Sequence, residues 1–144
     1  MEITAKGRYA VRIMVDIAKN SPGYISLADI SSRQNISIKY AEKIISMLVK
    51  GNLLESMRGQ QGGYKLIKNP CDYSVKEILV LTGDVSHISK CENESECERR
   101  DICDAVGVFV NLNDIINEYL SNVSLQDLVD KTYGKYVLKV ENNG

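Results

Sequence analysis

Three evenly spaced cysteines constrain the middle of this chain more than any other feature of the sequence. Cys91, Cys97 and Cys103 form a C-x5-C-x5-C pattern within a polar, charged stretch. An α-helix turns about 100° per residue, so thiols six residues apart on one helix would point in three different directions. A loop that wraps around a common centre would instead let them converge. Thiols that converge without an apolar core around them indicate a metal centre.

Length and hydropathy limit the classes of protein to which the chain can belong. Its 144 residues are enough for one ordinary domain with an appended element. No apolar run reaches the roughly 18–20 residues that a membrane span needs, and residues 1–6 lack the apolar core of a secretion signal. We therefore expect a cytoplasmic protein with no membrane partner. Disulfides rarely persist in that compartment, which favours a metal-binding role for the cysteines.

The two halves of the chain differ in charge. The net charge of −1 argues by itself against a nucleic-acid-binding protein. Residues 1–70, however, contain 11 Lys and Arg against 5 Asp and Glu, a net charge of +6, whereas residues 71–144 contain 7 against 14, a net charge of −7. This split predicts a polyanion-binding module joined to a module of another kind, with chance asymmetry as the alternative.

Apolar periodicity in the first half predicts three helices, over residues 5–20, 26–35 and 37–50. The second and third are joined by a tight turn, and the third has polar groups at its front, which is the helix-turn-helix pattern. Two short strands at 53–57 and 64–67 then flank a glycine-rich tip. A hairpin in this place is a wing, an interpretation favoured over a plain surface turn. Its glycines let the backbone and Arg58 approach a groove closely.

The second half predicts further helices and a pairing surface. A capping box at Ser74 begins a helix that ends near residue 82, and a longer helix covers about 104–122. A short helix follows residue 124, and the tail at 135–144 is expected to be frayed or a short strand. The apolar stripe of the long helix is wider than a small domain needs, which suits packing against a second copy of the chain, with packing only within its own subunit as the alternative. The fold class expected is mainly α, a winged helix-turn-helix (three helices plus a two-stranded wing) with a long C-terminal dimerisation helix.

Several motifs together resemble the IscR-like (Rrf-type) bacterial transcription regulators over nearly the whole chain. They are the segments 6–11, 27–31, 36–42 and 58–64, together with the placing of the cysteine loop. The resemblance implies a homodimeric DNA-binding repressor of iron–sulfur cluster assembly genes that recognises a near-palindromic operator. It implies that Cys91, Cys97 and Cys103 bind a 2Fe–2S cluster within a cluster-binding and dimerisation region at 71–134, after a DNA-binding domain at 1–70. The DNA-contacting residues expected from the pattern and the resemblance are Lys6, Arg8, Ser37, Lys39, Tyr40, Glu42, Lys43, Arg58 and Gly59.

The fourth cluster ligand is left open by the sequence. Val106 stands where the best-known relatives have a histidine, and an aliphatic side chain cannot bind iron. The candidates are Asp104, His87, Cys71, and a small thiol or water from outside the chain. A fourth ligand other than cysteine changes the potential and stability of such a cluster.

Three other functions compete with iron–sulfur sensing. The same cysteines would suit a zinc, thiol-redox or nitric oxide sensor. A regulator that controls cysteine metabolism with a protein partner is a second alternative. An enzyme is the third, and it finds no support, because the chain has one histidine, no nucleophile motif and no pocket signature with paired carboxylates.

Overall fold

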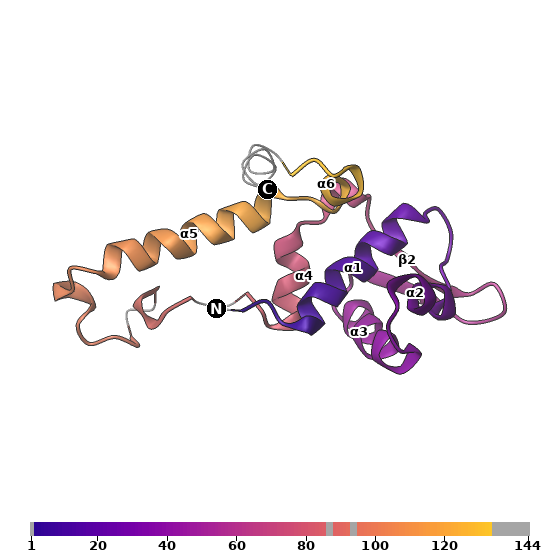
Figure 1. Ribbon diagram of the computed structural model, residues 1–144, viewed down its shortest axis with the longest axis horizontal. Helices are drawn as coiled ribbons and strands as arrows, with labels where there is room; N and C mark the ends of the chain where they lie inside the picture. The colour runs from indigo at the N-terminus through magenta and orange to yellow at the C-terminus, as the bar shows by residue number, and fades with distance from the viewer. Residues whose placement is uncertain (1, 86–87, 93–94, 134–144) are drawn as a thin grey trace.

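The computed structural model describes residues 2–85, 88–92 and 95–133, and shows a winged body from which one long helix projects as an arm (Figure 1). The cysteine segment lies at the far end of this arm. The mainly helical fold class expected from the sequence is confirmed. The expected tail at 135–144 lies outside the described residues, as does His87.

The helix-turn-helix consists of α1 (Ala5–Lys19), α2 (Leu27–Gln34) and α3 (Ile38–Lys50). A hydroxyl caps each helix, because the side chains of Thr4, Ser26 and Ser37 accept hydrogen bonds from amides of the first turn. α2 ends at Asn35, whose left-handed conformation (φ 53°) turns the chain towards α3. The three helices expected from periodicity are therefore present, and their caps fix where each begins.

The core lies where α1 and α3 face each other, and later helices complete it. α4 (Val75–Thr82) and α6 (Leu125–Asp130) both pack on α1. Ile78 from α4 and Leu125 from α6 are fully buried in the same cluster as the residues of the first three helices. Each such aliphatic side chain stabilises the fold by about 1.5–3 kcal/mol. The fully buried members on α1 and α3 are Ala10, Ile13, Met14, Ile17, Ala41, Ile44, Ile45 and Leu48.

An ion pair between the buried carboxylate of Asp16 and the exposed guanidinium of Arg33 joins α1 to α2. Asp16 is only 4% exposed, and its carboxylate accepts hydrogen bonds from Arg33 at 2.7 and 3.0 Å and from the side-chain amide of Gln34 at 2.8 Å. The hydrogen bonds to Asp16 raise the pKa of Arg33 above its usual value. A charge buried in this way costs little only when it is fully paired, so the C-terminal turn of α2 is held in one place on α1.

The wing is an antiparallel hairpin of β1 (Leu54–Met57) and β2 (Gly63–Leu66), close to the strands that the sequence predicts. Gly63 has φ +149°, and a Cβ atom there would lie 2.3 Å from the carbonyl oxygen of Ile25. This close approach lets Ile25 and Tyr64 exchange two backbone hydrogen bonds of 2.8 and 2.9 Å. The wing is therefore attached to the segment that leads into α2.

The arm is α5 (Val106–Asn122), and none of its residues is buried. It packs on α4 at one end and on the 3-10 turn η2 (Lys90–Glu92) of the cysteine segment. An apolar stripe along it faces solvent in the single chain, as the sequence pattern predicts. The exposed members of this stripe are Val108, Phe109, Leu112, Ile115 and Tyr119.

Tyr73 connects the wing to the end of α3. Its side chain is 1% exposed, and its hydroxyl donates to the carbonyl oxygen of Leu53 at 2.8 Å. The same hydroxyl oxygen accepts from the backbone amides of Ile67 and Lys68, at 2.9 and 3.0 Å. One hydroxyl thus satisfies three backbone groups where the hairpin leaves the core.

We predict that Tyr73→Phe lowers the free energy of unfolding by about 2 kcal/mol, because the buried carbonyl of Leu53 and two amides lose their partner. Urea denaturation followed by circular dichroism measures the change. Tyr24→Phe is the matched control, since the Tyr24 hydroxyl contacts the exposed side chain of Glu55 at 3.4 Å instead of a buried backbone carbonyl. Its expected effect is below about 0.5 kcal/mol. Equal losses in the two variants would contradict the role assigned to Tyr73.

Candidate nucleic-acid interface and metal centre

The exposed face of α3 carries most of the residues expected to read DNA. Lys39, Glu42 and Lys43 are all exposed, and they lie on the side of α3 opposite its buried stripe. Ser37 is exposed as well, but its hydroxyl oxygen accepts from the amide of Tyr40 at 3.1 Å and so caps the helix. This face brings positive and negative groups together at the front of the helix, where a helix-turn-helix meets base edges.

Tyr40 is held at one edge of this face instead of projecting from it. Its ring is half-buried and meets the ring of Tyr9 edge to face, with 5.7 Å between the ring centroids. The guanidinium of Arg12 lies 4.7 Å from the centroid of Tyr9, and its Nε donates to the side-chain oxygen of Gln34 at 3.1 Å. Tyr40 therefore also anchors the front of α3 on α1.

Lys6 and Arg8 lie in the first turn of α1, beside a carboxylate from the end of α4. Asp84 accepts hydrogen bonds from the amide of Thr4, at 2.9 Å, and from the hydroxyl of Thr82. Burial raises the pKa of Asp84, but these hydrogen bonds and the charge of Lys6 outweigh it, so its pKa lies below the ordinary value. Asp84 is thus ionised at neutral pH and ties the front of α1 to the point where the chain leaves for the cysteine segment.

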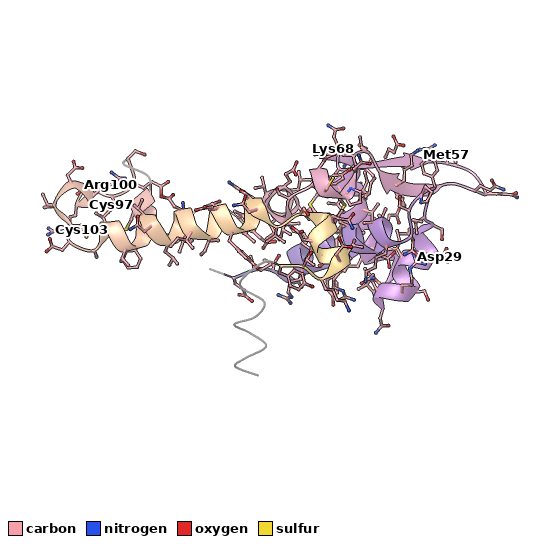
Figure 2. The ribbon with its side chains drawn as sticks, turned by 90° about the horizontal axis from the view of Figure 1, so that it is seen from above. Asp29, Met57, Lys68, Cys97, Arg100 and Cys103 are labelled. Atoms are coloured by element: carbon pink, nitrogen blue, oxygen red, sulfur yellow. The ribbon has the colours of Figure 1, made fainter. Side chains whose placement is uncertain are left out.

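The tip of the wing and the cysteine segment lie at opposite ends of the molecule. Arg58 and Gly59 are exposed at the tip, and Gly59 has φ +117°. In Figure 2, Met57, at the base of this tip, lies at one end of the molecule and Cys97 and Cys103 lie at the other. The reading surface and the candidate metal centre are therefore separate sites in one chain.

All three cysteines of the spaced pattern are free and half-buried, and Figure 2 shows Cys97 and Cys103 at the far end of the arm. Cys91 lies in η2, which packs on α5. The Nε of Arg100, in the 3-10 turn η3 (Arg100–Ile102), donates to the carbonyl oxygen of Cys91 at 2.9 Å. This bond spans nine residues and connects the turn of Cys91 to the turn that precedes Cys103.

The donor chemistry of this segment suits a soft metal or a cluster, because three thiols share one loop and none forms a disulfide. Among the residues that the structure describes, no group of three or more His, Cys, Asp or Glu side chains is close enough to hold a metal ion. The loop therefore brings the thiols to the same end of α5 without assembling a closed site from the described side chains.

The candidates for a fourth ligand occupy different places. Asp104 is exposed directly before α5, and Val106 is the first residue of that helix. Cys71 lies on the winged body in the 3-10 turn η1 (Pro70–Asp72), where its thiol is 3.9 Å from the Asp72 carboxylate. The body turn that holds Cys71 packs on α6 rather than on the arm.

The sequence pattern missed one residue of the reading face. Ile38 is the first residue of α3 and is 55% exposed, although it is a large apolar side chain. Helical spacing puts it three residues before Ala41 and seven before Ile45, at the edge of the buried stripe, so apolar periodicity alone predicts a buried side chain and gives no signal of its exposure. Asp84 was missed as well, because nothing local in the sequence indicates that a carboxylate 80 residues away contacts Thr4.

Comparisons with known proteins agree with this architecture. The profile of the Rrf2 family, described as "iron-dependent transcriptional regulator", matches residues 3–131. The chain belongs to the Rrf2 family. It is 39% identical to the HTH-type transcriptional regulator IscR of Photorhabdus laumondii over an alignment of 131 residues. That alignment covers 90% of this chain and 80% of the relative.

Two solved structures of similar proteins have the same fold. CymR (YrzC), the global cysteine regulator of B. subtilis, has a TM-score of 0.76 at 30% identity, over 92% of this chain and 98% of that chain. T. potens IscR has a TM-score of 0.72 at 29% identity, over 91% and 88% of the two chains.

Family membership confirms the resemblance inferred from the sequence motifs. This Rrf2 protein is a DNA-binding transcription regulator and not an enzyme. Within the described part of the chain, no helix is both long enough and apolar enough to cross a membrane.

Proposed function

We propose that this regulator senses iron–sulfur status through a 2Fe–2S cluster bound by Cys91, Cys97 and Cys103. The observation that carries the proposal is that three free thiols share one loop, in which the Arg100 side chain donates to the carbonyl oxygen of Cys91. The iron-dependent description of the family and the similarity to IscR proteins support it. When bound, such a cluster supplies a redox-active iron centre that is sensitive to oxidation, iron scarcity and nitric oxide.

The expected genes and location follow from the same proposal. Similarity to IscR proteins supports a cytoplasmic repressor of genes for iron–sulfur cluster assembly. The fourth ligand comes from Asp104, His87, Cys71 or an external thiol or water, since Val106 cannot bind iron. A zinc or thiol sensor that uses the same loop, or a regulator of cysteine metabolism, is the second candidate, favoured by the similarity to a global cysteine regulator.

DNA binding is assigned to the front of α3, the first turn of α1 and the wing. Lys39 and Lys43, together with Lys6 and Arg8, would neutralise phosphates and supply most of the affinity. Glu42 repels phosphate but can accept a hydrogen bond from the N4 amino group of cytosine, so it is placed to discriminate bases. The remaining assigned residues are Ser37, Tyr40, Arg58 and Gly59.

The arm is assigned to a homodimer. Its exposed apolar stripe is continuous over several turns, and such a patch marks an interaction surface. A two-fold pairing of arms would place two α3 helices on one face of DNA, about one helical turn apart, so the operator is a near-palindrome. Cluster binding to the cysteine segment beside α5 would then change the spacing of the two winged helix-turn-helix units of the dimer.

The first prediction concerns iron. Wild-type protein purified without air is expected to contain iron and acid-labile sulfide and to absorb visible light. The variants Cys91→Ser, Cys97→Ser and Cys103→Ser are each expected to lose most of this iron and sulfide, because three thiolates are needed to hold the centre. Cys71→Ser is the matched control and keeps its iron if Cys71 is not the fourth ligand. The iron contents of the variants Asp104→Ala, His87→Ala and Cys71→Ala are compared, and the variant that loses iron identifies the fourth ligand. A colourless protein with one bound zinc supports the second candidate, and absence of iron after reconstitution overturns the first.

The second prediction concerns DNA affinity. Lys39→Ala and Lys43→Ala each weaken binding to every duplex about equally, and each lowers the slope of log affinity against log salt by about one, because one phosphate contact is lost. Gel-shift titrations at several salt concentrations measure the slope. Lys19→Ala, exposed at the far end of α1, leaves the slope unchanged. An unchanged slope in the two α3 variants would remove this surface from the interface.

The third prediction concerns assembly. Ile115→Glu converts the dimer to monomers, because a charge in the middle of the apolar stripe cannot be buried against a partner. Light scattering after size exclusion measures the mass. Ser121→Glu adds the same side chain to α5, away from the stripe by helical spacing, and should leave the dimer intact. A wild-type protein that is monomeric at micromolar concentration contradicts the assignment.

A further inference from the structure

One large apolar side chain at the front of α3 is exposed, at the border between the buried stripe and the polar reading face. Ile38 is 55% exposed, whereas the apolar residues of the buried stripe on the same helix are 0–1% exposed. The other exposed side chains of this face are polar, and they belong to Lys39, Glu42, Lys43 and Ser46. A single exposed isoleucine needs no explanation on an ordinary surface, but here it occupies the end of the helix that enters the DNA groove.

The local structure holds Ile38 in a defined position. The hydroxyl of Ser37 caps α3 directly before it, so Ile38 is the first residue of a fixed helix and not part of a loop. Helical spacing puts Ile38 one turn before Glu42 and about 40° away from it around the axis, and about 20° from the buried Ile45, so it lies where the polar face meets the buried stripe. Tyr40, about 160° from Ile38, is packed on Tyr9 and prevents the helix from rotating.

We propose that Ile38 is a specificity-determining residue that packs against the 5-methyl group of a thymine in the operator. Thymine is the one base that presents a methyl group in the major groove, and an exposed aliphatic side chain has no hydrogen bond to offer any base. The inference rests on the proposal that the front of α3 enters the major groove. It adds a base identity that the charged residues of this face do not determine.

The spacing of the two side chains places this thymine relative to another base. Ile38 and Glu42 are four residues apart, which is about 6 Å along the helix axis. Successive base pairs are about 3.4 Å apart. With the axis of α3 along the groove, the thymine contacted by Ile38 therefore lies one or two base pairs from the cytosine whose N4 amino group donates to Glu42, in each half of the near-palindrome.

Replacement of thymine by deoxyuridine tests the inference, because it removes only the methyl group. A duplex with high affinity is first selected from a randomised pool with the wild-type protein, and each thymine is then replaced singly. We expect one thymine per half-site at which wild-type affinity falls about three- to fivefold, the effect of one methyl group leaving an apolar contact. For Ile38→Ala, the uracil and thymine duplexes bind equally at that position.

Two control variants make the result specific. Ile67→Ala removes the same side chain from a site that is 48% exposed after the wing, and it should keep the thymine preference. Glu42→Gln should relax the preference for the neighbouring cytosine and keep the methyl effect. Circular dichroism verifies that each variant is folded.

Two outcomes overturn the inference about Ile38. One is a wild-type protein that is indifferent to every methyl group in its site. The other is an Ile38→Ala protein that still discriminates thymine from uracil as strongly as the wild type. If no duplex can be selected, the result contradicts the proposal that α3 reads DNA and not only the inference about Ile38. The two failures are therefore distinguishable.

Discussion

The buried carboxylate of Asp16 is the interaction on which the reading head depends. It lies on the inner side of α1 and receives three short hydrogen bonds from the last turn of α2. An ionised group in that position would be strongly destabilising if it lost its partners, so α2 has one acceptable place on α1. Since only the short turn at Asn35 separates α2 from α3, the position of the recognition helix follows from this pair. The edge-to-face contact of Tyr9 and Tyr40 then fixes its rotation.

Much of the fold could be predicted from local pattern. The periodicity of apolar residues located the helices, hydroxyl residues located their first turns, and the glycines at 59 and 63 located the wing. These signals are local because each depends on residues within one or two turns. The charge split between the halves described the surface only, and could not reveal that Ile78 and Leu125 complete the core of the first three helices.

The candidate sites were predicted less completely, because they depend on contacts between distant residues. The cysteine spacing indicated a shared centre, and the structure carries the three thiols at one end of α5, but the bond from Arg100 to the carbonyl of Cys91 has no signature in the sequence. In the same way, the sequence pattern predicts Tyr40 as a DNA contact, yet its ring is half-buried and packs edge to face on Tyr9.

The attachment of the wing to the segment before α2 has a mechanical consequence. Ile25 and Tyr64 exchange backbone hydrogen bonds beside Gly63. Because of these bonds, the hairpin and the helix-turn-helix form one rigid unit that binds DNA as a whole. A conformational change that reaches this unit cannot easily move the wing separately from α3. It can alter gene expression mainly by changing the distance or the tilt between the two DNA-binding units of a dimer. A sensor with this structure would therefore distinguish operators by the spacing of their half-sites more than by the sequence of each half-site.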